Sequence, residues 1–200
     1  MRAQFGKLRS NKKVMQNTLI LCTVWTSSAY TFFFCEFYLR FVPTNTIYAQ
    51  KIYVGLADFC STLLVYYMAK RQGFIKVIMW LFGLLIVSSI SLVITLATSS
   101  ASDPDADLSP GLAALLTCSI IGMRIASFAS YVCYVQLVLL TPTLLTGIVF
   151  ACCGTVSRSL AILAPISAEL MGNPAWTCAV LAFAGILALP HLHFDTKTME

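Results

Sequence analysis

The stretch PTLLTGIVFACCGTVSRSLAILAP, residues 142–165, decides the fold of this chain. It is an apolar run with a proline at each end and a single charged side chain, Arg158, in its interior. A run of this length and composition is typical of a helix that crosses a lipid bilayer. An arginine inside such a helix costs roughly 3 kcal/mol on insertion scales, so Arg158 is a candidate functional residue.

The composition of the whole chain indicates the same class of protein. Of its 200 residues, 58% are hydrophobic and only 10% are charged, and the mean hydropathy is +0.83. A soluble domain of this composition would aggregate, so we predict an all-α integral membrane protein whose first partner is the lipid bilayer. The formal net charge of +5 is interpreted as loop charge that faces lipid headgroups, not as a contact with an acidic macromolecule.

Six membrane spans are predicted, which form one domain over residues 17–193. A basic flank at residues 1–16 precedes this domain and a short tail at 194–200 follows it. Turn-forming residues such as Pro43 and Gly73 separate the apolar runs. The predicted spans are 17–38, 49–68, 74–98, 111–140, 145–170 and 174–189.

Lysine and arginine predict the orientation of the bundle. Of the 13 basic residues, nine lie in the N-terminal flank, in the loop after the second span or in the tail. Only Arg40 and Lys51 lie on the opposite side, where the largest loop carries aspartates at 103, 105 and 107; we interpret that loop as solvated and not as a calcium site. The positive-inside rule then places both termini in the cytoplasm, or in the matrix of a mitochondrion. Both the plasma membrane and the mitochondrial inner membrane fit this orientation.

Three charged residues lie away from the ends of predicted spans: Asp58 in the second, Arg124 in the fourth and Arg158 in the fifth. Because lipid-facing helices avoid charge, these three spans are expected to line a polar interior or to contact protein. Two arginines against one aspartate would favour an anionic or zwitterionic ligand. In the alternative interpretation, Asp58 pairs with one arginine while the other reaches the interface or meets a partner chain.

Several uncharged polar side chains are further candidates for a substrate path: Tyr30, Tyr131, Tyr134 and Gln136. Hydrogen-bonded tyrosines inside a bundle would explain the same pattern without a ligand. Glu36 and Glu169 lie at the ends of spans and are predicted to be interfacial.

Other chemistry is not indicated by the sequence. It contains no phosphate-binding glycine loop, no zinc motif and no nucleophile elbow, so we expect no enzymatic activity, no cofactor and no nucleic-acid binding. His191 and His193 do not form a metal site by themselves. The eight cysteines lie in apolar runs without a CxxC pair and are interpreted as small buried hydrophobic residues.

Residues 142–165 resemble the penultimate helix of the organic cation/anion transporter family, which belongs to the major facilitator superfamily. The spacing from the first proline through Arg158 to the closing ILAP matches that helix without a gap. Two further segments resemble the first helix of that family's C-terminal half and the motif after its last helix: residues 18–21 with Trp25 and Tyr30, and residues 194–197.

The resemblance implies a six-helix bundle equivalent to one half of a transporter. In such halves the first, second, fourth and fifth helices line the cavity, and the third and sixth are peripheral. The position of Arg158 faces the substrate cavity in the family, and an arginine there is typical of the branches that carry anions and zwitterions. Alternating access needs two bundles, so the chain is expected to require a second copy or another protein.

The sequence also departs from the family at the inner gate. The loop after the second span, residues 70–76, has no acidic residue, although the family places an aspartate there. Leu139 and Thr146 stand where the family has a glutamate and an arginine. The loss of these gate charges is evidence against a normal transport cycle.

Two functional hypotheses follow. In the first, the chain is a degenerate half-transporter that serves as a non-transporting structural subunit of a larger membrane complex, for which a mitochondrial respiratory assembly is one compatible host. In the second, it is a half-size secondary transporter that works as a dimer on small organic anions or zwitterions, with Arg158 as the counter-charge of the ligand.

Overall fold

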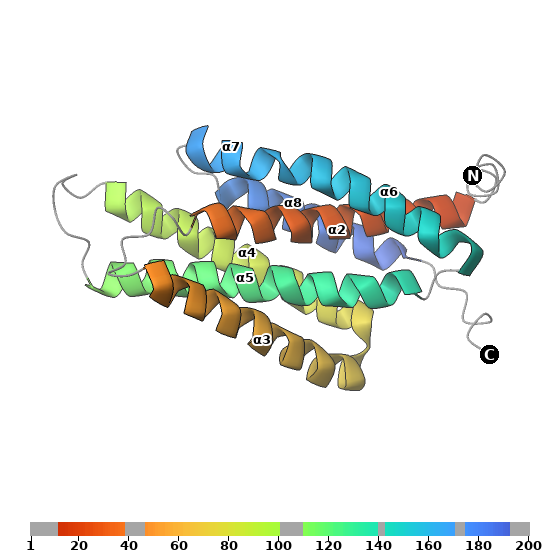
Figure 1. The fold of residues 1–200 in the computed structure, drawn as a ribbon, viewed down its shortest axis with the longest axis horizontal. Coiled ribbons are helices and arrows are strands. Elements are labelled where there is room, and N and C mark those ends of the chain that lie inside the picture. Colours follow the sequence, from red (N-terminus) through yellow and green to blue (C-terminus); the bar gives the residue numbers. More distant parts are fainter. Residues whose placement is uncertain (1–11, 39–46, 101–109, 140–142, 171–174, 193–200) are drawn as a thin grey trace.

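The computed structural model describes residues 12–38, 47–100, 110–139, 143–170 and 175–192, and no strand occurs within these ranges. Figure 1 shows the helices running back and forth along one axis. Their bounds are α2 Lys12–Tyr38, α3 Ile47–Gln72, α4 Phe74–Ser100, α5 Pro110–Leu139, α6 Thr143–Ala161, α7 Leu163–Leu170 and α8 Ala175–Ala188, followed by the 3₁₀ turn η2 Leu189–His191.

The described residues confirm the predicted all-helical fold, and five helical segments are long and apolar enough to cross a membrane. These segments are Lys12–Tyr38, Lys51–Gln72, Phe74–Thr98, Gly111–Val138 and Thr146–Ser167. The sixth predicted span corresponds to α8 and η2, a shorter apolar helix over Ala175–His191. Its 14 α-helical and three 3₁₀ residues extend over about 27 Å, close to the thickness of a bilayer core.

The fifth predicted span appears as two helices because its helical geometry is interrupted at Ile162, between α6 and α7. Pro165 explains the interruption: it has no N–H to donate to the carbonyl of Ala161, and its ring crowds that carbonyl. Arg158 lies in the last turn of α6, just before the break.

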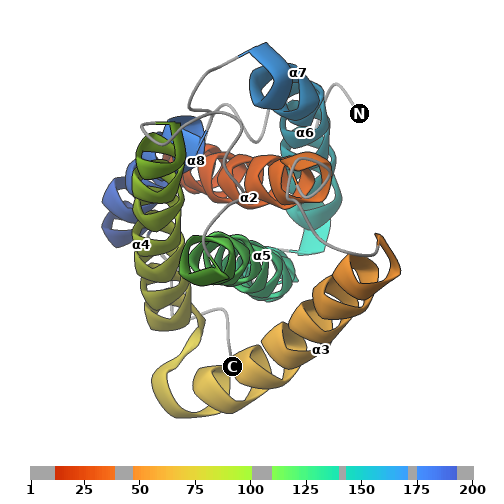
Figure 2. The same cartoon turned by 90° about the vertical axis from the view of Figure 1, so that its left-hand side faces the viewer.

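The central helix of the bundle is α2, which packs against α5, α6, α7 and α8 (Figure 2). In its most apolar part, 67% of the residues are buried. Helix α4 packs against α5 and α8 on the side of α2 opposite to α6. Helix α3 stands at the edge, packs chiefly against α5, and has only 22% of the corresponding residues buried.

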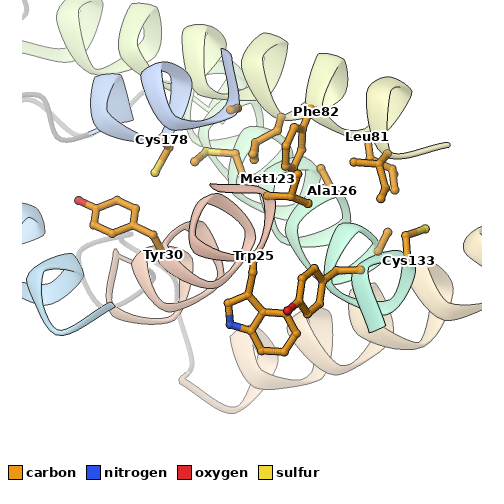
Figure 3. Close-up of a cluster of buried hydrophobic side chains, with 14 of the residues drawn as sticks. Trp25, Tyr30, Leu81, Phe82, Met123, Ala126, Cys133 and Cys178 are labelled. Carbon is orange, nitrogen blue, oxygen red and sulfur yellow. The ribbon is translucent and has the colours of Figure 1, made fainter. Parts of the chain in front are cut away.

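The core lies where α2, α4, α5 and α8 meet, and Figure 3 shows part of it, including Phe82, Met123 and Cys178. Two glycines permit close approach of helices there. A Cβ atom on Gly185 would lie 2.2 Å from the ring of Phe82, and one on Gly122 would lie 2.7 Å from the Oγ of Ser88. Side-chain hydroxyls inside the helices bond to carbonyls one turn earlier, as at Thr18, Ser28, Thr95, Thr117 and Ser130.

Five of the described basic residues gather at one end of the bundle. The start of α2 and the turn between α3 and α4 lie at this end (Figure 1), and they carry Lys12, Lys13, Lys70, Arg71 and Lys76. Gly73 forms that turn with a φ of +79°, a conformation that glycine adopts readily. The predictions for residues 1–11, for the loop at 101–109 and for residues 193–200, including His193, lie outside the described residues.

Candidate functional site

A cluster of four charged side chains joins α2, α3 and α5; we call it the charge cluster, and it consists of Glu36, Lys51, Asp58 and Arg124. Arg124 on α5 donates from Nε to Oδ1 of Asp58 and from Nη2 to Oδ2, both at 2.8 Å. This parallel pair of bonds is the strongest geometry for an arginine and a carboxylate. The Arg124 side chain is 5% exposed and that of Asp58 is 25% exposed.

The remaining nitrogen of Arg124 binds α2. Nη1 donates to the carbonyl oxygen of Phe32 at 3.2 Å and lies 3.4 Å from Oε2 of Glu36, whose other oxygen accepts from Lys51. The guanidinium carbon also stands 3.5 Å from the centre of the Phe32 ring, a cation–π contact. Two cations thus face two carboxylates, so the charge cluster is neutral when all four groups are ionised.

The charge cluster shows the pairing of Asp58 with one arginine, which was one of the two interpretations of the buried charges. Glu36 was predicted to be interfacial, and its contact with Arg124 was not predicted. The signal was present, because Phe32 and Glu36 are four residues apart and share one face of α2.

A pocket of about 320 Å³ lies between α2, α5 and α6. Aromatic rings dominate its wall, and its polar side chains include two serines, the tyrosine Tyr131 and one arginine. The lining residues are Trp25, Ser28, Ala29, Phe32, Phe33, Phe128, Tyr131, Ser157 and Arg158.

Arg158 brings a positive charge to this pocket from α6. Its side chain is exposed on the surface of the bundle, and no carboxylate pairs with it within the described part of the chain. Arg158 stands fifteen residues after the start of α6, about 22 Å along a segment of α6 and α7 that is about 42 Å long. An unpaired cation therefore lies near mid-span beside an aromatic wall.

The two arginines occupy different surroundings. Arg124 is not among the lining residues of the pocket, whereas Phe32 takes part in both groups: its ring contacts Arg124 and also lines the pocket. The two arginines therefore do not line one cavity, which helix periodicity alone could not decide.

The other predicted site residues do not line the pocket. Tyr30 is buried and its hydroxyl bonds to Ser167 on α7 and to Thr177 on α8, at 3.1 Å in the second case. Tyr134 is fully buried, with its ring 4.0 Å from that of Trp25. Gln136 is exposed on α5 away from the pocket.

Three phenylalanines of the wall were not predicted from the sequence: Phe32, Phe33 and Phe128. Their signal is helical spacing, since Phe32 follows Trp25 by seven residues on α2 and Tyr131 follows Phe128 by three on α5. Aromatic residues at this spacing are also typical of an ordinary core, and only the packing of α6 against α2 distinguishes the two cases.

The chemistry of the pocket suits a small molecule with an apolar or aromatic body and one negative group, because rings stack and a guanidinium binds carboxylate. Comparison with models of known protein families gives no match, and comparison with characterised proteins gives no significant relative. The resemblance to the organic cation/anion transporters therefore stays a prediction from the sequence.

Proposed function

We propose that this chain is a non-transporting structural subunit, a helical bundle that docks against a second membrane bundle in a larger complex. The proposal includes descent from one half of a major facilitator transporter. The observation that carries it is Arg158, an arginine near mid-span that is exposed on the bundle surface and has no acidic partner among the described residues.

Lipid is an unfavourable neighbour for Arg158. A side chain near a helix end reaches the headgroups, but this one lies about 22 Å from the start of α6. A second membrane bundle with a carboxylate at the same depth would remove this cost. We therefore expect the partner to present an aspartate or glutamate to the surface formed by α2, α5 and α6.

The state of the interior charges supports a structural role. Arg124 is already neutralised by Asp58 and Glu36, and its bonds hold α3 and α2 against α5. A carrier keeps some binding groups available for its solute, whereas the charge cluster commits all four of its side chains to one another.

The proposal is tested by extracting the membrane in a mild detergent and identifying, on a native gel, the particle that contains this chain. We expect co-migration with other membrane subunits on a native gel, and a loss of that particle in Arg158→Glu, where two carboxylates would face each other. Arg71→Glu, at the end of α3, is the matched control and should leave the particle intact. A free monomer or homodimer in the wild type would refute the structural-subunit proposal.

A second candidate function is favoured by the pocket itself. About 320 Å³ of space with an aromatic wall and one guanidinium that pairs with no carboxylate of the described residues suits a small organic anion or zwitterion. Under this hypothesis two copies of the chain form a half-size secondary transporter, and the guanidinium of Arg158 neutralises the negative charge of the ligand.

Uptake into vesicles that contain only this protein tests the second candidate. A labelled aromatic carboxylate should accumulate with the wild type, with Arg158→Lys retaining part of the flux and Arg158→Ala losing at least tenfold. Arg71→Ala is the control for a general effect of charge. Absence of flux in the wild type, or a flux unchanged in Arg158→Ala, would exclude this role for Arg158.

A further inference from the structure

Helices α2 and α6 bring two cysteines into direct contact. Cys22 on α2 and Cys153 on α6 are 131 positions apart in the sequence, and their Sγ atoms lie 3.0 Å apart. Cys153 is buried between the helices, and Cys22 is half-buried. Neither residue takes part in the charge cluster or lines the pocket.

The geometry of this pair suits a disulfide. The S–S bond length is about 2.05 Å, so the two sulfur atoms need to approach by only about 1 Å. The two helices already pack against each other along this line. All eight cysteines are free thiols in the structure, and Cys152 follows Cys153 directly on α6, so helical geometry turns the two side chains about 100° apart.

We propose that Cys22 and Cys153 form a redox-active pair that is oxidised to a disulfide by organic hydroperoxides and restored by thiol reductants. Cys22 is the more accessible of the two, so its sulfur attacks the terminal oxygen of the hydroperoxide. The O–O bond breaks, the thiol proton of Cys22 passes to the departing alkoxide so that an alcohol leaves, and Cys22 becomes a sulfenic acid. The sulfur of Cys153 then displaces that oxygen as water, which forms the S–S bond; the two thiols lose two electrons and the peroxide gains them.

A hydroperoxide of a lipid or of similar polarity fits the location of the site. Both cysteines lie inside helices that are long and apolar enough to span a membrane, where a charged oxidant would not partition. The bond would form one helical turn from the pocket, since Trp25 follows Cys22 by three residues and Ser157 follows Cys153 by four. Oxidation would therefore link two of the three helices that line the pocket by a covalent bond.

The test is a count of thiols in the purified full chain in detergent. After treatment with tert-butyl hydroperoxide, the protein is denatured and its remaining thiols are tagged with a maleimide of large mass. We expect six tags on the oxidised chain and eight on the chain that is subsequently reduced with dithiothreitol. Peptide mapping should identify the link between Cys22 and Cys153.

Three variants complete the experiment. Cys22→Ser should keep all seven remaining thiols under the same treatment. Cys153→Ser should show six tags, because Cys22 is still oxidised and stops at the sulfenic acid, with no Cys22–Cys153 link. The control Cys152→Ser should drop from seven to five. Eight tags on the treated wild type, or a mapped link between any other two cysteines, would overturn the proposal. Mapping of the wild-type peptides decides the question even if a variant fails to fold.

Discussion

Arg124 and Arg158 are the same residue type at comparable depth, and their neighbours give them different roles. Arg124 is enclosed by two carboxylates, a backbone carbonyl and a phenylalanine ring. Arg158 has an aromatic pocket on one side and the surface of the bundle on the other. Arg124 joins α2, α3 and α5, whereas the exposed side chain of Arg158 is accessible to a ligand or a partner protein.

Removal of the Arg124 charge tests whether this arginine stabilises the folded bundle. Arg124→Met leaves Asp58 and Glu36 without their shared cation, and the loss of one partner from a buried ion pair costs about 3 kcal/mol or more. We expect a lower free energy of unfolding in detergent, followed by tryptophan fluorescence in a thermal or denaturant melt. The double variant Asp58→Asn with Arg124→Met should recover part of the loss.

The matched control for that experiment is Arg71→Met, because the guanidinium of Arg71 lies over the ring of Tyr67 at the exposed end of α3. It should change the unfolding midpoint little. If Arg124→Met is as stable as the wild type, the charge cluster does not join the three helices.

At the scale of the helices, contact between α4 and α8 depends on the absence of a side chain at Gly185. A Cβ atom there would lie 2.2 Å from the fully buried ring of Phe82, so that ring or the helix backbone would have to shift. We expect Gly185→Ala to lower the free energy of unfolding by about 1–3 kcal/mol through overpacking. The same melt measures this change.

Gly83→Ala is the control for the glycine-to-alanine change, since a Cβ atom at Gly83 meets nothing within 4 Å. Alanine favours a helix over glycine by about 1 kcal/mol, so this variant should be neutral or slightly stabilised. Equal effects of the two substitutions would show that helix propensity, not the contact with Phe82, determines the outcome.

Helix positions were well predicted because long apolar runs are a strong signal. The predicted spans 17–38, 74–98 and 111–140 lie close to α2, α4 and α5. The break between α6 and α7 was not predicted, although Pro165 in the middle of the run was its visible cause.

The candidate site was predicted less completely than the helices. Arg158 and Tyr131 were named and do line the pocket, whereas Tyr30 and Tyr134 are buried elsewhere. Which face of a helix points inward depends on its rotation, and hydropathy constrains rotation weakly when every face is apolar. The contact between Cys22 and Cys153 depends on the same rotations and could not be read from spacing.

At the scale of the whole molecule, the basic residues predict which end of the bundle faces the cytoplasm or the matrix. Lys70 lies at the basic end and Lys51 at the opposite end. In sealed vesicles of known orientation, a membrane-impermeant maleimide should label Lys70→Cys from the cytoplasmic or matrix side and Lys51→Cys from the other. The wild type, whose described cysteines lie within helices, gives the background; labelling of both variants from one side would contradict the predicted topology.

The central position of α2 has a consequence for the order in which the bundle is assembled. Its neighbours α5, α6, α7 and α8 all follow it in the sequence, so they do not yet exist when α2 is synthesised. The hydroxyls of Thr26 and Ser27 on α2 are buried and have no hydrogen-bond partner in the described part of the finished bundle. During synthesis the buried hydroxyls of this helix are therefore exposed until the later helices pack against it. The chain reaches its final packing only when α8 has been inserted.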